Sequence, residues 1–185
     1  MGKGLLSKRY DISPEDVIRA KNLVKGKTIP KILIFDIETS PMKAYVWKLW
    51  KTNVNLDHII NEWFCIAWSA KWLYSTEVMG EVLTPEEIKR EDDKRIISSL
   101  WDLINKADIV VAHNGNKFDI PRINARFIIH DLPPTKPYFS IDTCLIARRQ
   151  FGFSSNKLDA LAGYFNIPHK LDTDFDLWKR CLGGD

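Results

Sequence analysis

The sequence contains few cysteines and no long apolar run. Its three cysteines, Cys65, Cys144 and Cys181, are widely spaced and form no CxxC pair. This spacing argues against a disulfide framework or a zinc ribbon, and favours buried, unreactive thiols in a reducing cytosol. No apolar stretch approaches the roughly 18 residues that cross a bilayer, and the N-terminus lacks the apolar core of a signal peptide. We therefore expect a cytoplasmic protein without membrane contact.

Neither sign of charge dominates the chain as a whole. The 185 residues are 45% apolar and 28% charged, with a net charge of +3, which is typical of one soluble globular domain. Residues 1–31 hold eight Lys or Arg and three acidic residues, a net charge of +5, so the remaining residues carry −2. A basic leader is compatible with phosphate binding, and equally with a solvated tail.

Residues 1–30 are predicted to form a basic, helical extension. Ser13 as N-cap, Pro14 at the first helical position and Gly26 after the last turn predict a helix over residues 13–25. One helix of a DNA-binding pair would have the same pattern. We favour a packing or linker element, because no partner helix follows.

Three strands are predicted near the start of the remaining chain. Runs of branched and aromatic residues predict strands over 31–37, 44–50 and 63–72, and the third continues towards Val82 through a turn. Their short connections favour antiparallel neighbours. A fourth, fully apolar strand is predicted over residues 108–112 and is of the kind that lies in a sheet centre.

Helices are predicted between and after these strands. The capping pattern that begins at Thr84 predicts one helix whose apolar face runs from Ile96 to Ile104. Further helices are predicted from Pro121 and over residues 142–150 and 156–165. The order β-β-β-α-β-α, followed by more helix, predicts an α/β fold with a mixed sheet flanked by helices.

Two carboxylates lie at the end of the first predicted strand, in Phe35-Asp36-Ile37-Glu38-Thr39. Alternate residues of a strand face the same side, so Asp36 and Glu38 lie roughly 7 Å apart. Unpaired in a dry site they would repel each other, and a divalent cation that prefers oxygen ligands supplies the missing charge. Solvated acids on an edge strand are the alternative. The apolar residues 32–35 argue against it, because they predict burial on both faces.

A further acid follows the strand predicted over residues 108–112. In the segment from His113 to Asp119, Gly115 permits a tight turn, and Asp119 precedes the helix that Pro121 begins. Sites in α/β sheets form at the carboxyl ends of strands. Asp119 is therefore a candidate ligand, but Asp is also a common helix cap, and taken alone the residues leave both interpretations open.

In combination these two motifs are specific. Asp36-Ile37-Glu38, followed roughly 80 residues later by Asn114-x-x-x-Phe118-Asp119, resembles the first two motifs of 3′–5′ exonucleases of the DEDD superfamily. These enzymes are ribonuclease-H-like, are frequent in bacteriophages and are related to polymerase proofreading domains. The segments Ile141–Leu145 and Asn156–Leu161 resemble the stretch before the third motif. We expect Asp142 and Asp159, within them, to be helix caps or first-turn acids.

The resemblance implies a two-metal nuclease. Asp36, Glu38 and Asp119 would bind two divalent ions, Mg²⁺ or Mn²⁺, around the scissile phosphate, one activating water and the other stabilising the leaving oxygen. The exonuclease domain would span residues 31–185. Its partners would be a nucleic acid, DNA in preference to RNA, and a polymerase or another replication protein.

The resemblance also implies residues that bind the substrate. Thr39, Asn114 and Phe118 would position the terminal nucleotide and the loop that carries Asp119. Asn114 and Phe118 also fit the roles of ordinary turn and core residues, and of the two Phe118 fits a core position better.

The family needs a fourth acid, and its identity stays open. His169 and Asp174 match the HxxxxD spacing, in which the His serves as a general base. The stretch from Leu171 to Asp176 resembles a loop, however, and we favour a structural role for it. Otherwise the domain stops short of a tyrosine-type third motif beyond Asp185, and further residues or a second polypeptide would complete the site.

Three functions fit these residues. The first is a metal-dependent 3′–5′ exonuclease, which we favour. The alternative is a catalytically weak or inactive nucleic-acid-binding module of the same fold, which lacks the fourth acidic ligand. The third is an endonuclease or resolvase that uses the same acids and would cut circular DNA.

Overall fold

A β-sheet forms the centre of the molecule in the computed structural model, which describes residues 29–168 and 174–183. Its strands are β1 (Ile32–Thr39), β4 (Cys65–Trp72), β5 (Met79–Val82), β6 (Ile109–Ala112) and β7 (Phe139–Asp142). Two short strands, β2 (Lys43–Ala44) and β3 (Ile59–Asn61), pair with each other outside it, and a 3-10 turn, Leu56–His58, precedes β3. The helices are α3 (Pro85–Arg90), α4 (Lys94–Ile104), α5 (Asp119–Ile129), α6 (Thr143–Gln150), α7 (Leu158–Tyr164) and α8 (Phe175–Gly183).

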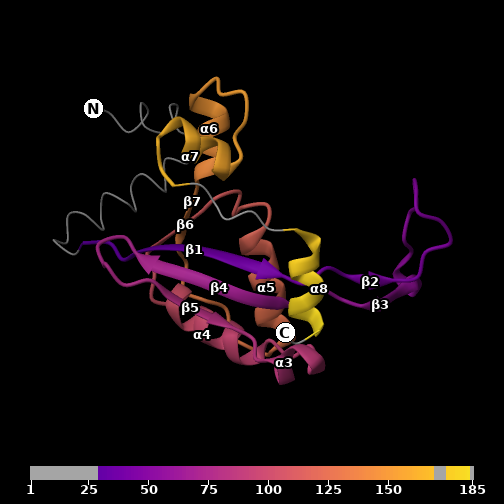
Figure 1. Ribbon diagram of the computed structural model, residues 1–185. Coiled ribbons are helices and arrows are strands. Elements are labelled where there is room, and N and C mark those ends of the chain that lie inside the picture. Colours follow the sequence, from indigo (N-terminus) through magenta and orange to yellow (C-terminus); the bar gives the residue numbers. More distant parts are fainter. Residues whose placement is uncertain (1–28, 169–173, 184–185) are drawn as a thin grey trace.

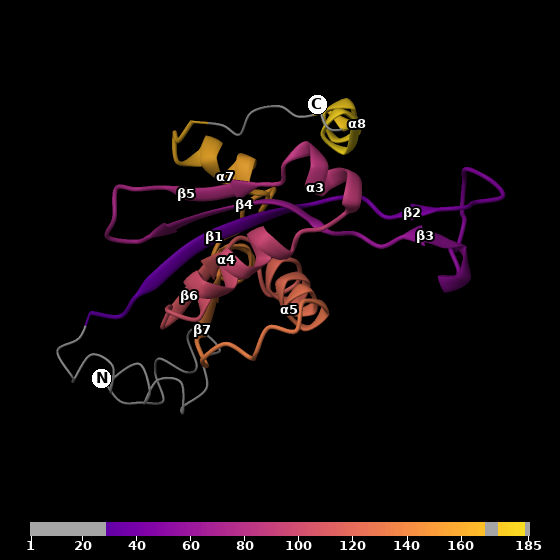
Figure 2. The same ribbon diagram turned by 90° about the horizontal axis from the view of Figure 1, so that it is seen from below.

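The five strands of the sheet are ordered β5-β4-β1-β6-β7. Strands β5, β4 and β1 are antiparallel neighbours, and β1, β6 and β7 run parallel. Helices α4 and α5 lie on one side of the sheet, with α7 and α8 on the other (Figures 1 and 2). The predicted α/β fold with a mixed sheet is therefore confirmed. The helix predicted over residues 13–25 lies outside the described residues.

The central strand β1 has one closed face and one partly open face. Leu33, Phe35 and Ile37 are buried in one core with apolar residues of α4 and α5. On the opposite face Ile34 is 38% exposed, and Asp36 is exposed as well. The expectation of burial on both faces is therefore wrong, although β1 is central. This open face leaves the carboxylate of Asp36 accessible to solvent and ligands.

The prediction of a single helix from Thr84 is wrong, because the chain forms two helices there, α3 and α4. Glu91 ends α3 in the left-handed conformation, with φ of 56°. Asp93 then turns its carboxylate inward, where it accepts the N–H of Cys65 at 2.8 Å. The apolar face predicted from Ile96 to Ile104 belongs to α4 alone.

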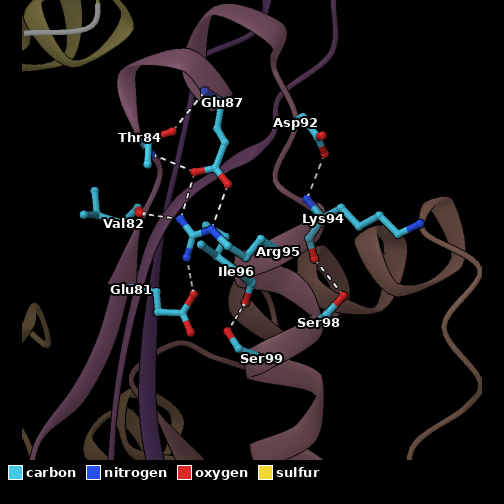
Figure 3. Close-up of polar contacts among 10 residues, drawn as sticks. All are labelled: Glu81, Val82, Thr84, Glu87, Asp92, Lys94, Arg95, Ile96, Ser98 and Ser99. Atoms are coloured by element: carbon cyan, nitrogen blue, oxygen red, sulfur yellow. Dashed lines mark hydrogen bonds and ion pairs between the residues drawn. The ribbon is translucent and has the colours of Figure 1, made fainter.

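The start of α3 is held by a capping box that also binds α4 (Figure 3). Thr84 Oγ1 accepts the N–H of Glu87 at 3.2 Å, and the Glu87 carboxylate accepts the N–H of Thr84 at 2.8 Å. Arg95 donates to the same carboxylate at 2.7 Å and to Glu81 at 2.6 Å. The hydrogen bond from Arg95, followed by that from the Thr84 backbone, lowers the pKa of Glu87 to about 2.

We expect Thr84→Ala to lower the free energy of unfolding by about 1 kcal/mol, because the N–H of Glu87 loses its acceptor. Thr84→Ser keeps a hydroxyl at this position and should retain most of the stability. Urea unfolding of the two variants measures the difference. Equal stability of Thr84→Ala and the wild type would show that the cap contributes nothing.

Two segments after β1 differ from the predicted pattern. The strand predicted over residues 44–50 is wrong, because only Lys43 and Ala44 pair with β3, and the residues after them form an irregular loop. Strand β7 was not predicted: it follows a proline-rich stretch and contains only four residues. The prediction of a loop from Leu171 to Asp176 is also wrong at its C-terminal end, because α8 begins at Phe175.

The thiols of Cys65 and Cys144 are buried, as predicted, whereas Cys181 is only partly buried. Burial, with the nearby negative charge of Asp93, raises the pKa of Cys65 to about 12. The thiol therefore stays protonated at neutral pH, and an unreactive role follows. Across residues 29–168 and 174–183, no helix combines the length and apolar character that a membrane span requires.

Candidate active site

The first part of the site is the carboxyl end of β1. Asp36 is exposed and Glu38 is half-buried on the side of β1 opposite the buried Ile37. Strand β6 runs parallel to β1, with Ile34 opposite Val111. The loop after β6 therefore begins close to the level of Asp36, which brings the second predicted motif to the first.

Asp119 joins the two motifs through a hydrogen bond. Its side chain is 1% exposed at the start of α5, and its Oδ1 accepts the N–H of Ile37 at 3.2 Å. That N–H lies between Asp36 and Glu38, 82 residues earlier in the chain. This contact ties the start of α5 to β1 beside the first motif, and the role of Asp119 as a site residue stays a prediction.

The electrostatics of Asp119 show that Asp36 is close to it. Burial, and then the negative charge of Asp36, raises the pKa of Asp119 from 3.8 to about 6. The N–H of Ile37 opposes this shift without cancelling it. The fold therefore holds Asp119 where its ionised form is destabilised, an arrangement common in functional sites.

This shift predicts a pH dependence of stability in metal-free buffer. The folded chain keeps the Asp119 proton up to about pH 6, whereas the unfolded chain loses it near pH 3.8. Between these values the folded state binds more protons, so this contribution to the free energy of unfolding falls as pH rises, by about 3 kcal/mol in total. Above about pH 6 the contribution of Asp119 to the free energy of unfolding no longer changes with pH.

Asp119→Asn removes this titration and keeps an acceptor for Ile37. Urea unfolding in EDTA should therefore show the variant gaining stability relative to the wild type as pH rises from 4 to 6. A stability difference that is constant over that interval would contradict the proposed environment of Asp119.

Asp142 organises the loop that carries the second motif. Its buried carboxylate accepts the N–H groups of Asn114 at 3.0 Å and Asn116 at 3.2 Å. It also accepts the N–H groups of Cys144 and Leu145, and so caps α6. Asp142 is therefore the structural helix cap that the sequence predicts. Asp159 lies in the first turn of α7, also as predicted.

Gly115 lies in this loop, but the left-handed residue is its neighbour Asn114, with φ of 64°. A Cβ on Gly115 would lie 2.5 Å from the Cβ of Ala112. Glycine is thus required here by the close approach of the loop to β6 rather than by a left-handed turn.

We expect Gly115→Ala to lower the free energy of unfolding by about 1–3 kcal/mol, because the added methyl group overpacks the junction of β6 with the loop. Gly152→Ala is the matched control, since a Cβ there meets no atom within 4 Å. Thermal or urea unfolding compares the two. If both variants unfold alike, the packing argument is wrong.

Two of the three residues predicted to bind substrate, Thr39 and Phe118, contact a cation that the sequence did not reveal, Arg122. Arg122 Nη1 donates to Thr39 Oγ1 at 3.2 Å. Its guanidinium also lies 4.4 Å from the centroid of the Phe118 ring and 4.6 Å from that of Trp63. Phe118 packs against the core, as expected, and also holds this cation. Arg122 is one helical turn after Phe118, and that spacing was the available signal.

Asn114 lies on the border of a pocket of about 380 Å³ between the loop and helices α6 and α7. Arg148 and Lys157 contribute positive charge to its lining. His113 beside it bonds to Thr143 Oγ1 and to the carbonyl of Asn156, both at 2.9 Å. These bonds tie the loop to the segment after β7.

The predicted fourth acid is only partly described. Asp174 accepts the N–H of Leu177 at 3.0 Å and so caps the start of α8. His169 lies outside the described residues. The role of either residue in metal binding stays a prediction.

The acids of the two motifs have the donor chemistry that Mg²⁺ or Mn²⁺ uses. In residues 29–168 and 174–183, no three His, Cys, Asp or Glu side chains are gathered closely enough to enclose an ion. What is in place is a buried carboxylate, Asp119, destabilised by the charge of Asp36, with Glu38 two residues further along β1. A divalent cation between these oxygens would remove the repulsion, so the donor set fits such an ion.

Comparison with known proteins agrees with this fold. The family model of the RNase H superfamily matches residues 33–176. Among solved structures, the family B DNA polymerase of the hyperthermophilic archaeon Pyrobaculum calidifontis is similar, with a TM-score of 0.55 and 17% sequence identity. The match covers 77% of this chain and 19% of the polymerase chain. No curated protein matches. The match to the family model covers most of the sequence, including both acidic motifs, and the chain therefore belongs to the RNase H superfamily.

Proposed function

We propose that the chain is a metal-dependent nuclease that removes nucleotides from the 3′ ends of nucleic acid, DNA in preference to RNA. The observation that carries this proposal is the hydrogen bond from Ile37 N–H to Asp119 Oδ1. It places the acid of the second motif against the strand that carries Asp36 and Glu38. The fold shared with a DNA polymerase supports a nucleic acid as the substrate.

In this proposal Asp36, Glu38 and Asp119 hold two divalent ions. When bound, such ions supply an activated water and stabilise the oxygen that leaves the scissile phosphate. Asp119 contributes a carboxylate fixed by the backbone of β1. Arg122, fixed by the Phe118 ring and by Thr39, contributes a positive charge beside the substrate phosphate.

A nucleic-acid-binding module without turnover is the second candidate. The absence of a closed group of metal ligands among the described residues favours it. Such a module would bind nucleic acid in a salt-dependent manner and leave its substrate intact with every divalent ion.

Oligonucleotides labelled at one end separate these functions. With Mg²⁺ or Mn²⁺, a 3′-exonuclease should release the 3′ label at once as a mononucleotide, while a 5′-labelled strand shortens stepwise. EDTA should stop both reactions, and closed circular DNA should stay intact. Cutting of the circle would indicate an endonuclease, and salt-dependent binding without products would indicate the binding module. Release of the 5′ label first would contradict the proposed polarity.

A further inference from the structure

Residues 43–61, which include β2 and β3, form an arm that projects away from the main sheet (Figures 1 and 2). It leaves the sheet directly after the candidate active-site strand β1. Its base is fixed by Glu91, which accepts from Lys43 Nζ at 3.0 Å and from Asn61 Nδ2 at 2.6 Å. The arm is therefore anchored at its base, and its far end points into solvent.

The arm carries large aromatic side chains that pack against little else. Trp47 is 93% exposed, Trp50 81% and Tyr45 75%. Leu49 between the two tryptophans is 85% exposed. Fully burying such a side chain stabilises a protein by about 1.5–3 kcal/mol. A concentration of exposed aromatic residues on one projection is therefore the mark of a binding surface.

Positive charge is interleaved with these aromatic residues. Each exposed tryptophan is followed by a lysine, as Trp47-Lys48 and Trp50-Lys51, and both lysines are exposed. Residues 43–61 hold three lysines and one acidic residue, Asp57, which is exposed. The arm is thus aromatic and carries a net positive charge, with both lysines beside the tryptophans.

We propose that this arm binds single-stranded nucleic acid by stacking bases on Trp47 and Trp50 while Lys48 and Lys51 contact phosphates. The proposal rests on the proposed nuclease function and extends it, because the arm would hold the strand whose 3′ end lies at the acids. Aromatic rings that alternate with cations suit this ligand, since every base has a face to stack and every nucleotide a phosphate.

Charge complementarity favours nucleic acid over a protein partner. The buried centres of protein–protein interfaces are depleted in lysine, whereas the end of this arm pairs lysine with each tryptophan. A protein or lipid ligand for the arm is the competing outcome of the tests below.

The first test measures binding without cleavage. The affinity of the full chain for a fluorescent oligothymidylate is measured in EDTA, at several salt concentrations. Trp47→Ala and Trp50→Ala should each weaken binding by about 5- to 150-fold. Lys48→Gln with Lys51→Gln should reduce the slope of log Kd against log salt by about 1.4. Tyr74→Ala removes an aromatic residue that is 76% exposed outside the arm, and should change neither value.

The second test separates the arm from the chemistry. A nitrophenyl ester of thymidine 5′-phosphate supplies a phosphodiester too small to reach the arm. With divalent ions, the arm variants should cleave this ester at the wild-type rate and degrade oligonucleotides more slowly.

The two tests fail in distinguishable ways. The arm proposal is wrong if the tryptophan variants bind the oligonucleotide with wild-type affinity. It is also wrong if these variants lose ester cleavage and oligonucleotide degradation to the same extent. A change only in self-association, or only in binding to anionic vesicles, would likewise overturn the arm proposal. If the wild type cleaves no phosphodiester, the nuclease proposal fails, while binding in EDTA still decides the role of the arm.

Discussion

Asp119→Asn should reduce metal-dependent cleavage of nucleic acid by roughly 10³-fold, the largest effect expected of any single change. Metal ions contribute several kcal/mol to transition states of phosphoryl transfer, and each 1.36 kcal/mol corresponds to a factor of ten in rate. The neutral amide still accepts the N–H of Ile37 but contributes no negative charge to hold a cation. The initial rate at which a 5′-labelled strand shortens measures the effect.

The stability of this variant makes the result interpretable. Asp119 is destabilised by burial and by Asp36, so Asp119→Asn should unfold at the same or a higher urea concentration than the wild type at pH 7. Asp102→Asn, the same change at an exposed position of α4, is the matched control and should keep full activity. Full activity of Asp119→Asn would refute the assignment of Asp119 as a metal ligand.

Asp93→Ala should lower the free energy of unfolding by about 3–5 kcal/mol. Asp93 is fully buried, its Oδ2 accepts from Cys65, and its Oδ1 bonds to the buried guanidinium of Arg126 and to His130. Together these contacts join α4, α5 and β4. Without the carboxylate, a buried guanidinium and a backbone N–H would lose their partner.

Urea unfolding with two comparisons tests this prediction. Asp92→Ala removes the neighbouring, exposed carboxylate, and should cost far less. Adding Arg126→Met to Asp93→Ala should recover part of the loss, because the uncompensated charge is then removed as well. A cost for Asp93→Ala no larger than that for Asp92→Ala would contradict a structural role of this network.

The proximity of the two acidic motifs could be predicted from the sequence, whereas several details of the fold could not. Asp36, Glu38 and Asp119 occur in motifs whose residue types and spacing reflect chemistry, and the topology brings Asp119 to β1. Arg122 escaped prediction because an arginine in the first turn of a helix is usually solvated. Only the folded chain shows that the rings of Phe118 and Trp63 flank it.

The errors in the predicted fold have physical causes. Residues 44–50 have the composition of a strand, but strand propensity depends on a partner, and pairing with β3 ends at Ala44. The helix predicted from Thr84 is interrupted because Asp93 makes buried contacts with distant residues. Neither cause is visible in local sequence periodicity.

Diffraction from crystals soaked in millimolar Mn²⁺, recorded at a wavelength where manganese scatters anomalously, tests the central claim most directly. We predict anomalous density between the carboxylates of Asp36 and Asp119, with Glu38 as a further ligand, and its loss in Asp119→Asn. Wild-type crystals that show Mn²⁺ only elsewhere, or none at these carboxylates, would contradict the claim that the two motifs form one metal site.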